Sequence, residues 1–124
     1  MAITKKKVLV ADDEKPLSKA LQLKLEREGF LVSVANDGSE AIGFLEKDSF
    51  DILLLDLMMP KVDGFAVLQF MKDKKIKSPV IVLTNLSQEV DAARAKELGA
   101  VGCFVKSDTP ITDVISQVKK ILKM

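Results

Sequence analysis

Five residues of this sequence have side chains that could carry out chemistry together, and each lies at or just after the end of a short apolar run. They are Asp12, Asp13, Asp56, Thr84 and Lys106. Asp56 is the most unusual, because it interrupts the apolar stretch FDILLLDLMMP at residues 50–60. A buried carboxylate is costly unless it is paired, hydrogen-bonded or bound to a metal. We therefore expect Asp56 to lie in a site that compensates its charge.

Phosphoryl transfer is the chemistry that these residue types favour. Three carboxylates in one crevice would repel one another by roughly 4 kcal/mol per pair at about 4 Å and an effective dielectric constant near 20, so they require a cation. Lys106 supplies one positive charge, and Mg²⁺ fits the remainder because it binds carboxylates, waters and phosphate oxygens. The chain has no histidine and one cysteine, which argues against a zinc site. Asp56 would attack phosphorus as a nucleophile, while Thr84, Lys106 and the metal stabilise the transferred oxygens.

The apolar runs beside these residues are short and mostly apolar throughout, which is typical of strands buried on both faces of a parallel sheet. They span residues 7–11, 30–35, 51–56, 79–84 and 102–106. Segments of helical length lie between them, and the clearest apolar stripe runs from Ile111 to Leu122 after Pro110. We predict an α/β fold with a single doubly wound, five-stranded parallel sheet and five helices on its two faces, joined by right-handed crossovers.

The strand ends explain how the polar residues would meet. In open parallel sheets, ligands bind beyond the carboxyl ends of the strands, where the strand order reverses. In the order 2-1-3-4-5, strands 1 and 3 are neighbours, and the three aspartates come together at the reversal. Taken singly, Asp12 and Asp13 are more often helix N-caps, Thr84 a turn hydroxyl and Lys106 a solvated charge. Their combination at one edge favours a site.

The helix expected from about Ser87 to Leu98 differs from the others. Its apolar side consists mainly of Val90, Ala93 and Leu98, with further alanines alongside. Small side chains bury little surface, so we expect this helix to be the most weakly anchored and able to move in a switch. An ordinary alanine-rich helix explains the composition equally well.

Composition limits the remaining possibilities. A length of 124 residues with 48% hydrophobic residues predicts one domain with a proper core. Nineteen basic against eighteen acidic residues give a net charge of +1, which argues against nucleic acid or a membrane as direct partner. The single cysteine, Cys103, fits a reducing compartment. We expect a cytoplasmic protein, because no apolar run has the length of a signal peptide core or a membrane span.

Four motifs resemble those of the receiver domains of two-component response regulators, and the resemblance covers essentially the whole chain, residues 1–124. They are VLVADDE at 8–14, LLLDLMMPKVDG at 53–64, IVLTN at 81–85 and FVK at 104–106. The second is the most specific, because an acid, Met-Pro and Asp-Gly rarely coincide at this spacing. The resemblance implies a flavodoxin-like fold, and the strand order used above is taken from it.

The resemblance also implies a role for each residue. Asp56 would accept a phosphoryl group from a sensor histidine kinase or a phosphotransfer protein, with Thr84 and Lys106 holding the phosphoryl oxygens. The implied Mg²⁺ ligands are Asp12 through a water, Asp13, Asp56 and the backbone carbonyl of Met58. Such a domain catalyses its own phosphorylation and dephosphorylation rather than turnover of an external substrate. Its signal would reach a downstream protein through the face made by the fourth helix, fifth strand and fifth helix.

Three positions depart from the family pattern. Cys103 stands where receivers commonly have a switching aromatic residue, Ser107 replaces a proline, and Asn85 replaces a small residue, where it either crowds the acceptor or adds a hydrogen bond. We favour a small buried hydrophobe over a redox sensor for Cys103. Adjacent Phe104 should point to the opposite face of its strand. These departures keep open a constitutive interaction module without a working switch, whereas a magnesium phosphohydrolase lacks an evident general base.

Overall fold

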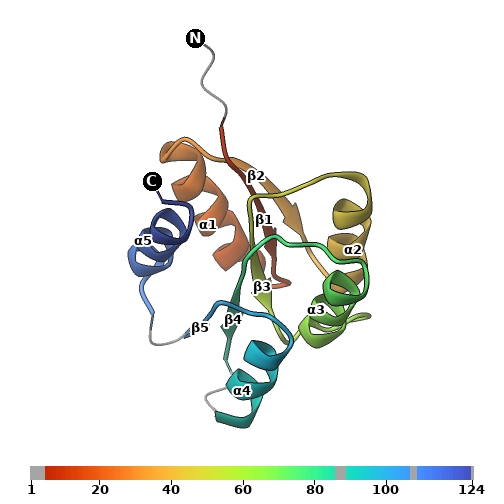
Figure 1. Cartoon of the computed structure of the whole chain (residues 1–124). Coiled ribbons are helices and arrows are strands. Elements are labelled where there is room, and N and C mark those ends of the chain that lie inside the picture. The colour runs from red at the N-terminus through yellow and green to blue at the C-terminus, as the bar shows by residue number, and fades with distance from the viewer. Residues whose placement is uncertain (1–4, 86–88, 107–108, 124) are drawn as a thin grey trace.

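The computed structural model describes residues 5–85, 89–106 and 109–123, and within these ranges five strands alternate with five helices (Figure 1). The strands are β1 (Lys7–Ala11), β2 (Leu31–Ala35), β3 (Ile52–Asp56), β4 (Val80–Thr84) and β5 (Gly102–Val105). The helices are α1 (Lys15–Arg27), α2 (Gly38–Lys47), α3 (Gly64–Asp73), α4 (Glu89–Glu97) and α5 (Ile111–Ile121). The predicted alternation of strands and helices is confirmed.

All strand pairs in the sheet are parallel, and the strand order is β2-β1-β3-β4-β5. This confirms the doubly wound, flavodoxin-like fold. Every residue of β3 and β4 is buried, which explains why these segments are apolar throughout rather than alternating. The order reverses between β1 and β3, the two strands that carry Asp12 and Asp56 at their carboxyl ends.

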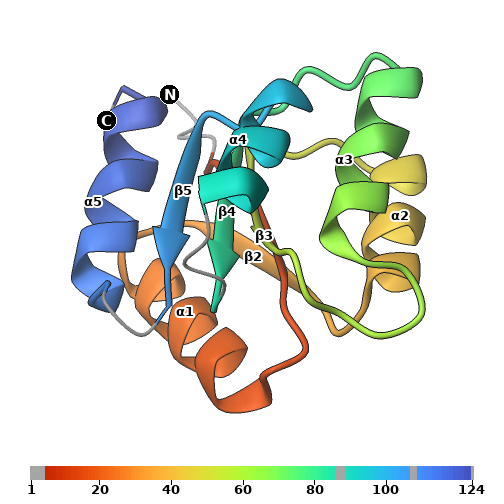
Figure 2. The ribbon, with the colours of Figure 1, turned by 90° about the horizontal axis from the view of Figure 1, so that it is seen from below.

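Two hydrophobic clusters hold the helices against the sheet. Successive residues of β1 point to opposite faces, so Val8 and Val10 belong to one cluster and Leu9 to the other. The first cluster also includes residues of α1 and α5, and the second includes residues of α2 and α3. Figure 2 shows the same division, with α1 and α5 on one side of the sheet and α2 and α3 on the other.

The described side chains of α4, residues 92–97, attach this helix through few contacts. Among its described side chains, Ala95 is fully buried, whereas Ala93 is exposed. The Arg94 guanidinium lies over the ring of Phe65 in α3, 4.1 Å from the ring centroid. The small buried area agrees with the predicted weak anchoring, but the prediction that Ala93 lies on the apolar side is wrong, because Ala95 is buried in its place. Ser87 and the side chain of Val90, which belonged to the same prediction, lie outside the described residues.

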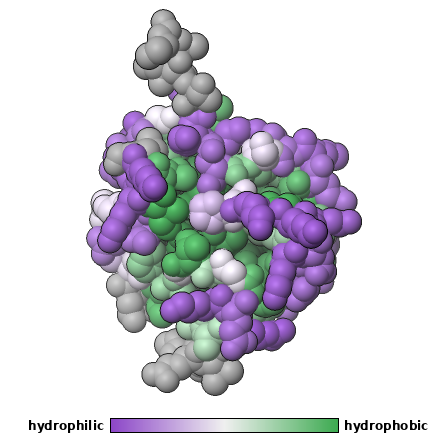
Figure 3. Space-filling model, viewed as in Figure 1, coloured by the Kyte–Doolittle hydropathy of each residue, from purple (hydrophilic) through white to green (hydrophobic). Residues whose placement is uncertain are grey.

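The surface mixes apolar and polar areas. Figure 3 shows apolar residues in the middle of one face, bordered by hydrophilic residues. No helix in the described part of the chain is long and apolar enough to cross a membrane.

Candidate functional site

The carboxyl ends of the strands bring the predicted side chains to one edge of the sheet. Asp12 follows β1, Asp56 ends β3, Thr84 ends β4 and Lys106 follows β5. Asp12, Asp56 and Thr84 are buried, with exposed fractions of 0%, 2% and 1%, whereas Asp13 is exposed. Carboxylate oxygens of the three aspartates all lie within 4.8 Å of one another. The structure therefore brings the three acids together and places Thr84 at the same edge.

The Lys106 ammonium lies among these acids. Its Nζ atom is 2.8 Å from Asp12 Oδ2, 3.0 Å from Asp56 Oδ2 and 3.2 Å from Glu14 Oε1, and its side chain is 5% exposed. The backbone N–H of Lys106 donates to the Thr84 carbonyl at 2.8 Å, which fixes where the loop after β5 begins. A buried ion pair offsets its desolvation cost only when the charges are well matched. Among the described residues, Lys106 is the one cation in contact with these three carboxylates.

This imbalance shows in the protonation of Asp56. Burial raises the pKa of Asp56 to about 6, and the nearby charge of Asp12 adds to the rise, while hydrogen bonds from Lys106 and from the Met58 N–H at 3.1 Å oppose it. For Lys106, burial acts to lower the pKa, but the close contacts with the negatively charged Asp12 and Asp56 outweigh it and raise the pKa. Lys106 therefore stays charged at neutral pH, whereas Asp56, with a pKa of about 6, loses its proton slightly below neutral pH.

The loop after β3 is shaped by the start of α3. The Asp63 carboxylate caps this helix by accepting from the Ala66 N–H at 2.9 Å, and the Gly64 N–H donates to the Leu57 carbonyl at 3.0 Å. A Cβ atom at Gly64 would lie 2.5 Å from the Asp56 carbonyl oxygen. The helix start thus lies directly against the strand end, and the Asp-Gly pair of the motif sets the position of Asp56.

The donor set fits a magnesium ion. Asp12 Oδ2 is buried and, although Lys106 Nζ lies 2.8 Å away, it receives no hydrogen bond of acceptable geometry within the described residues. Buried carboxylate oxygens in native proteins nearly always have such a partner. Asp13 is exposed, so the cluster is open to solvent on one side. Several oxygen ligands beside accessible water match what Mg²⁺ binds in proteins.

Sequence reasoning missed one member of the site, Glu14. Its carboxylate accepts hydrogen bonds from Lys106 and from Asn85, the latter at 3.1 Å. Glu14 occupies the N-cap position of α1, but its side chain makes no capping hydrogen bond. The available signal was its place directly after Asp12 and Asp13 in one loop. For Asn85, the structure favours the hydrogen bond over crowding of the acceptor.

The prediction for Cys103 is wrong, because the residue is exposed rather than buried. It lies on the edge strand β5, beside a shallow hollow that α4 lines with the small side chains of Ala92 and Ala93 and with Lys96. Phe104 packs instead against the cluster that contains α1 and α5, as its strand direction predicts. Ser107 lies outside the described residues.

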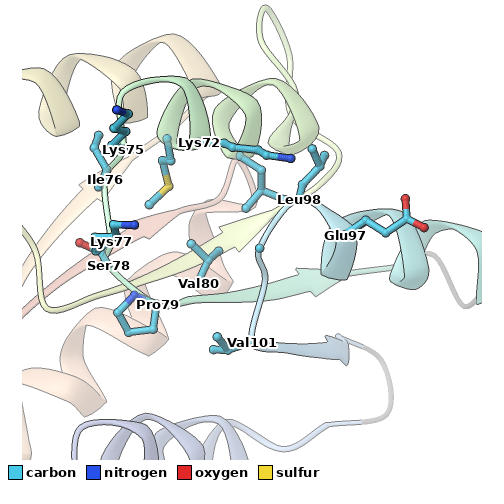
Figure 4. A pocket seen from close by; sticks show the side chains of 13 residues that line it. Lys72, Lys75, Ile76, Lys77, Ser78, Pro79, Val80, Glu97, Leu98 and Val101 are labelled. Carbon is cyan, nitrogen blue, oxygen red and sulfur yellow. The ribbon is translucent and has the colours of Figure 1, made fainter.

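A groove lies at the opposite end of the strands from the candidate site, and its lining residues are of a different kind. This groove of about 380 Å³ is lined by Val80 and Val101 at the starts of β4 and β5, with Lys72 and Glu97 at its rim (Figure 4). Glu97 is the one acid among its lining residues in the described part of the chain. The groove therefore lacks the clustered carboxylates that mark the candidate site.

Asp56→Asn should raise the melting temperature of the metal-free protein by about 3 to 8 °C near pH 7.5, and by little below about pH 4. The folded pKa of about 6 exceeds the ordinary value of 3.8. Deprotonation therefore costs the folded state stability as pH rises from about 4 to about 6, and the amide avoids that cost. Thermal unfolding in a chelator across this pH range measures the gain. A gain equally large at the acid end would contradict a buried, charge-crowded Asp56.

Comparison with known proteins identifies the family. The model of the response regulator receiver domain matches residues 8–116. The alkaline phosphatase synthesis transcriptional regulatory protein PhoP of Bacillus subtilis is 39% identical over 118 residues, which cover 95% of this chain and 49% of the relative. The chain thus spans about half the length of the curated relatives it matches.

Two solved structures share both the fold and part of the sequence. The receiver domain of the Francisella response regulator 1452 has a TM-score of 0.90 at 31% identity, covering 95% of this chain and 97% of that one. The signal receiver domain of a signal transduction histidine kinase from Syntrophus aciditrophicus has a TM-score of 0.85 at 30% identity, covering 95% and 90%. The chain therefore belongs to the response regulator receiver domain family of two-component systems.

Proposed function

We propose that this domain accepts a phosphoryl group on Asp56 from a phosphohistidine of a sensor histidine kinase or phosphotransfer protein. The observation that carries the proposal is the set of charged groups around the Asp56 carboxylate. Its buried carboxylate lies 3.0 Å from the Lys106 ammonium and within a cluster of three aspartates. A nucleophilic carboxylate beside a fixed cation and metal-binding acids is equipped for phosphoryl transfer.

The transfer itself requires one bond to form and one to break. A carboxylate oxygen of Asp56 bonds to phosphorus while the phosphorus–nitrogen bond breaks, and the electron pair stays on the imidazole nitrogen. Asp56 must be deprotonated to attack, and with a pKa of about 6 it is mostly ionised at neutral pH. Lys106 and the Thr84 hydroxyl would donate to the transferred oxygens and stabilise their charge.

The acids would also hold the metal. Asp12 through a water, Asp13, Asp56 and the backbone carbonyl of Met58 are the proposed ligands of Mg²⁺. When bound, the ion neutralises negative charge on the carboxylates and on the phosphoryl oxygens. The buried Asp12 Oδ2, which accepts no hydrogen bond from the described residues although Lys106 lies 2.8 Å away, supports this assignment from the protein side.

Intact-mass spectrometry with acetyl phosphate tests the proposal. The wild-type protein should gain one phosphoryl group in the presence of Mg²⁺ and none in a chelator, and Asp56→Asn should gain none. Asp73→Asn is the matched control, because Asp73 lies on the exposed side of α3 and bonds only Gln69 among the described residues. An unmodified wild type, or an Asp56→Asn variant modified as readily as the control, would refute the assignment.

The output proposed for this domain is a shift of α4, β5 and α5 toward a second state that phosphate favours. Among the described side chains of α4, the small Ala95 is the buried one, which supports such a movement. A specific observation favours the alternative of a constitutive interaction module: exposed Cys103 offers no aromatic ring that could turn inward. Similar receiver domains belong to a transcriptional regulatory protein and to a histidine kinase. We therefore propose a protein as the downstream target and do not name which one.

Amide NMR spectra with and without beryllofluoride and Mg²⁺ separate these two outputs. A working switch should shift signals of α4 and β5 as well as those near Asp56. Shifts confined to the loops around Asp56, Thr84 and Lys106 would instead support the constitutive module.

A further inference from the structure

Three loops meet at the carboxylate of Glu14. Asn85, in the loop after β4, donates its side-chain amide to Glu14 Oε1 at 3.1 Å, and Lys106, after β5, donates to the same oxygen at 3.2 Å. The backbone N–H of Glu14 donates to Asp12 Oδ1 at 2.8 Å, which fixes the loop after β1. We call the contacts among Asn85, Glu14 and Lys106 the Glu14 bridge.

The bridge uses hydrogen-bonding capacity that the phosphorylation site needs. A lysine ammonium has three protons to donate. Three carboxylate oxygens already surround Lys106 Nζ, those of Asp12 at 2.8 Å, Asp56 at 3.0 Å and Glu14 at 3.2 Å, so a further acceptor can approach the ammonium only when one of these contacts opens. The same Glu14 oxygen accepts from both Asn85 and Lys106, so the loop after β4 and the loop after β5 are joined through one atom. Glu14 thus competes with Asp12 and Asp56 for the Lys106 ammonium.

We propose that the Glu14 bridge is a latch that restrains Lys106 before phosphorylation and slows phosphoryl acceptance by Asp56. This inference rests on the proposed function and adds two positioning residues to it. Lys106 must turn toward the transferred oxygens and release Glu14, and Asn85 opposes that release by holding Glu14 in place. An interaction made in the ground state and lost in the transition state raises the barrier. Weakening the bridge should therefore accelerate the reaction.

Rates of adduct formation with acetyl phosphate and Mg²⁺ test the latch. Asn85→Ala and Glu14→Gln should each raise the limiting rate by about fivefold, the effect of losing one partly exposed hydrogen bond. The double variant should be no more than about twofold faster than the faster single variant, because both changes break one bridge. Unchanged or slower rates in both single variants would overturn the latch.

Asn36→Ala is the matched control for these rates. Asn36 also donates its side-chain amide to a glutamate, Glu40 Oε1 at 3.4 Å, but in the loop after β2, without a contact to Lys106. Its rate should equal that of the wild type. An acceleration in this control equal to that of Asn85→Ala would overturn the assignment to the bridge.

A second readout needs neither metal nor phosphoryl transfer. The chain has two asparagines, Asn36 and Asn85, so asparagine-selective ¹⁵N labelling yields one reporter for the bridge and one internal reference. In metal-free protein, Glu14→Ala should shift the side-chain amide signals of Asn85 and leave those of Asn36 in place. Unmoved Asn85 signals would show that the bridge does not form in solution.

Phosphoryl acceptance by Asp56 and restraint of Lys106 by the Glu14 bridge are tested by different outcomes. A wild-type protein that gains no phosphoryl group refutes the proposed function itself. A wild type that is phosphorylated at the same rate as Asn85→Ala and Glu14→Gln refutes only the latch.

Discussion

Lys106→Met should slow adduct formation with acetyl phosphate by about 10²- to 10³-fold and destabilise the metal-free protein by about 3 kcal/mol. Methionine keeps the length of the side chain but removes the ammonium, which lies within 2.8 to 3.2 Å of three carboxylates. The buried Asp12 and Asp56 then lose their counter-charge, and the transferred oxygens lose a donor. Denaturant unfolding in a chelator measures the stability, and intact-mass kinetics measure the rate.

Lys119→Met is the control for this prediction. Lys119 also pairs with a glutamate, Glu28, at 2.5 Å, but on the surface between α5 and the end of α1. Surface pairs of this kind contribute about 0 to 1 kcal/mol, and Lys119 has no contact with the site. Mg²⁺ should restore stability to Lys106→Met more than to the wild type, since it supplies the missing positive charge. Equal losses in the two variants would mean that Lys106 is an ordinary surface charge.

Gly64→Ala should destabilise the protein by about 3 kcal/mol, at the upper end for overpacking a closely packed position. The added methyl group would lie 2.5 Å from the Asp56 carbonyl oxygen and 2.7 Å from the Leu57 Cα atom. These are backbone atoms, which cannot rotate away, so α3 or the end of β3 has to move. Urea denaturation measures the loss, and the displacement of Asp56 should also slow adduct formation.

Gly43→Ala is the control for this prediction, because it makes the same substitution at a helical glycine that has free space around it. Gly43 lies within α2, and nothing is found within 4 Å of a Cβ atom added there. Alanine is the better helix former, so this variant should be more stable by about 0.5 to 1 kcal/mol. If Gly64→Ala were as stable as Gly43→Ala, the close contact between α3 and β3 would not exist in solution.

Much of the fold could be predicted from the sequence, because strands that are buried on both faces of a parallel sheet have nearly continuous apolar sequences. β3 and β4 are buried along their whole length and read as unbroken apolar runs. Strand order leaves no such trace, since periodicity does not say which strands are neighbours. It came from the family resemblance, and the structure confirms it.

Some features of the candidate site could likewise be predicted from the sequence, and others could not. Asp56 stood out because a charge within an apolar run needs a physical reason. The bridge between Asn85 and Glu14 joins residues 71 positions apart, and neither residue type is unusual for a loop. Cys103 was misjudged because its exposure depends on how little α4 covers the edge strand, which the composition of β5 alone does not reveal.

Locating the phosphoryl group within the chain tests the central claim most directly. Borohydride reduces an aspartyl phosphate to homoserine, so fragmentation of the reduced, Mg²⁺-phosphorylated protein identifies the modified position. We expect homoserine at position 56 and unmodified Asp12 and Asp13. Homoserine at position 12 or 13, or a phosphoryl group on a hydroxyl or lysine side chain with Asp56 intact, would contradict Asp56 as the phosphoryl acceptor.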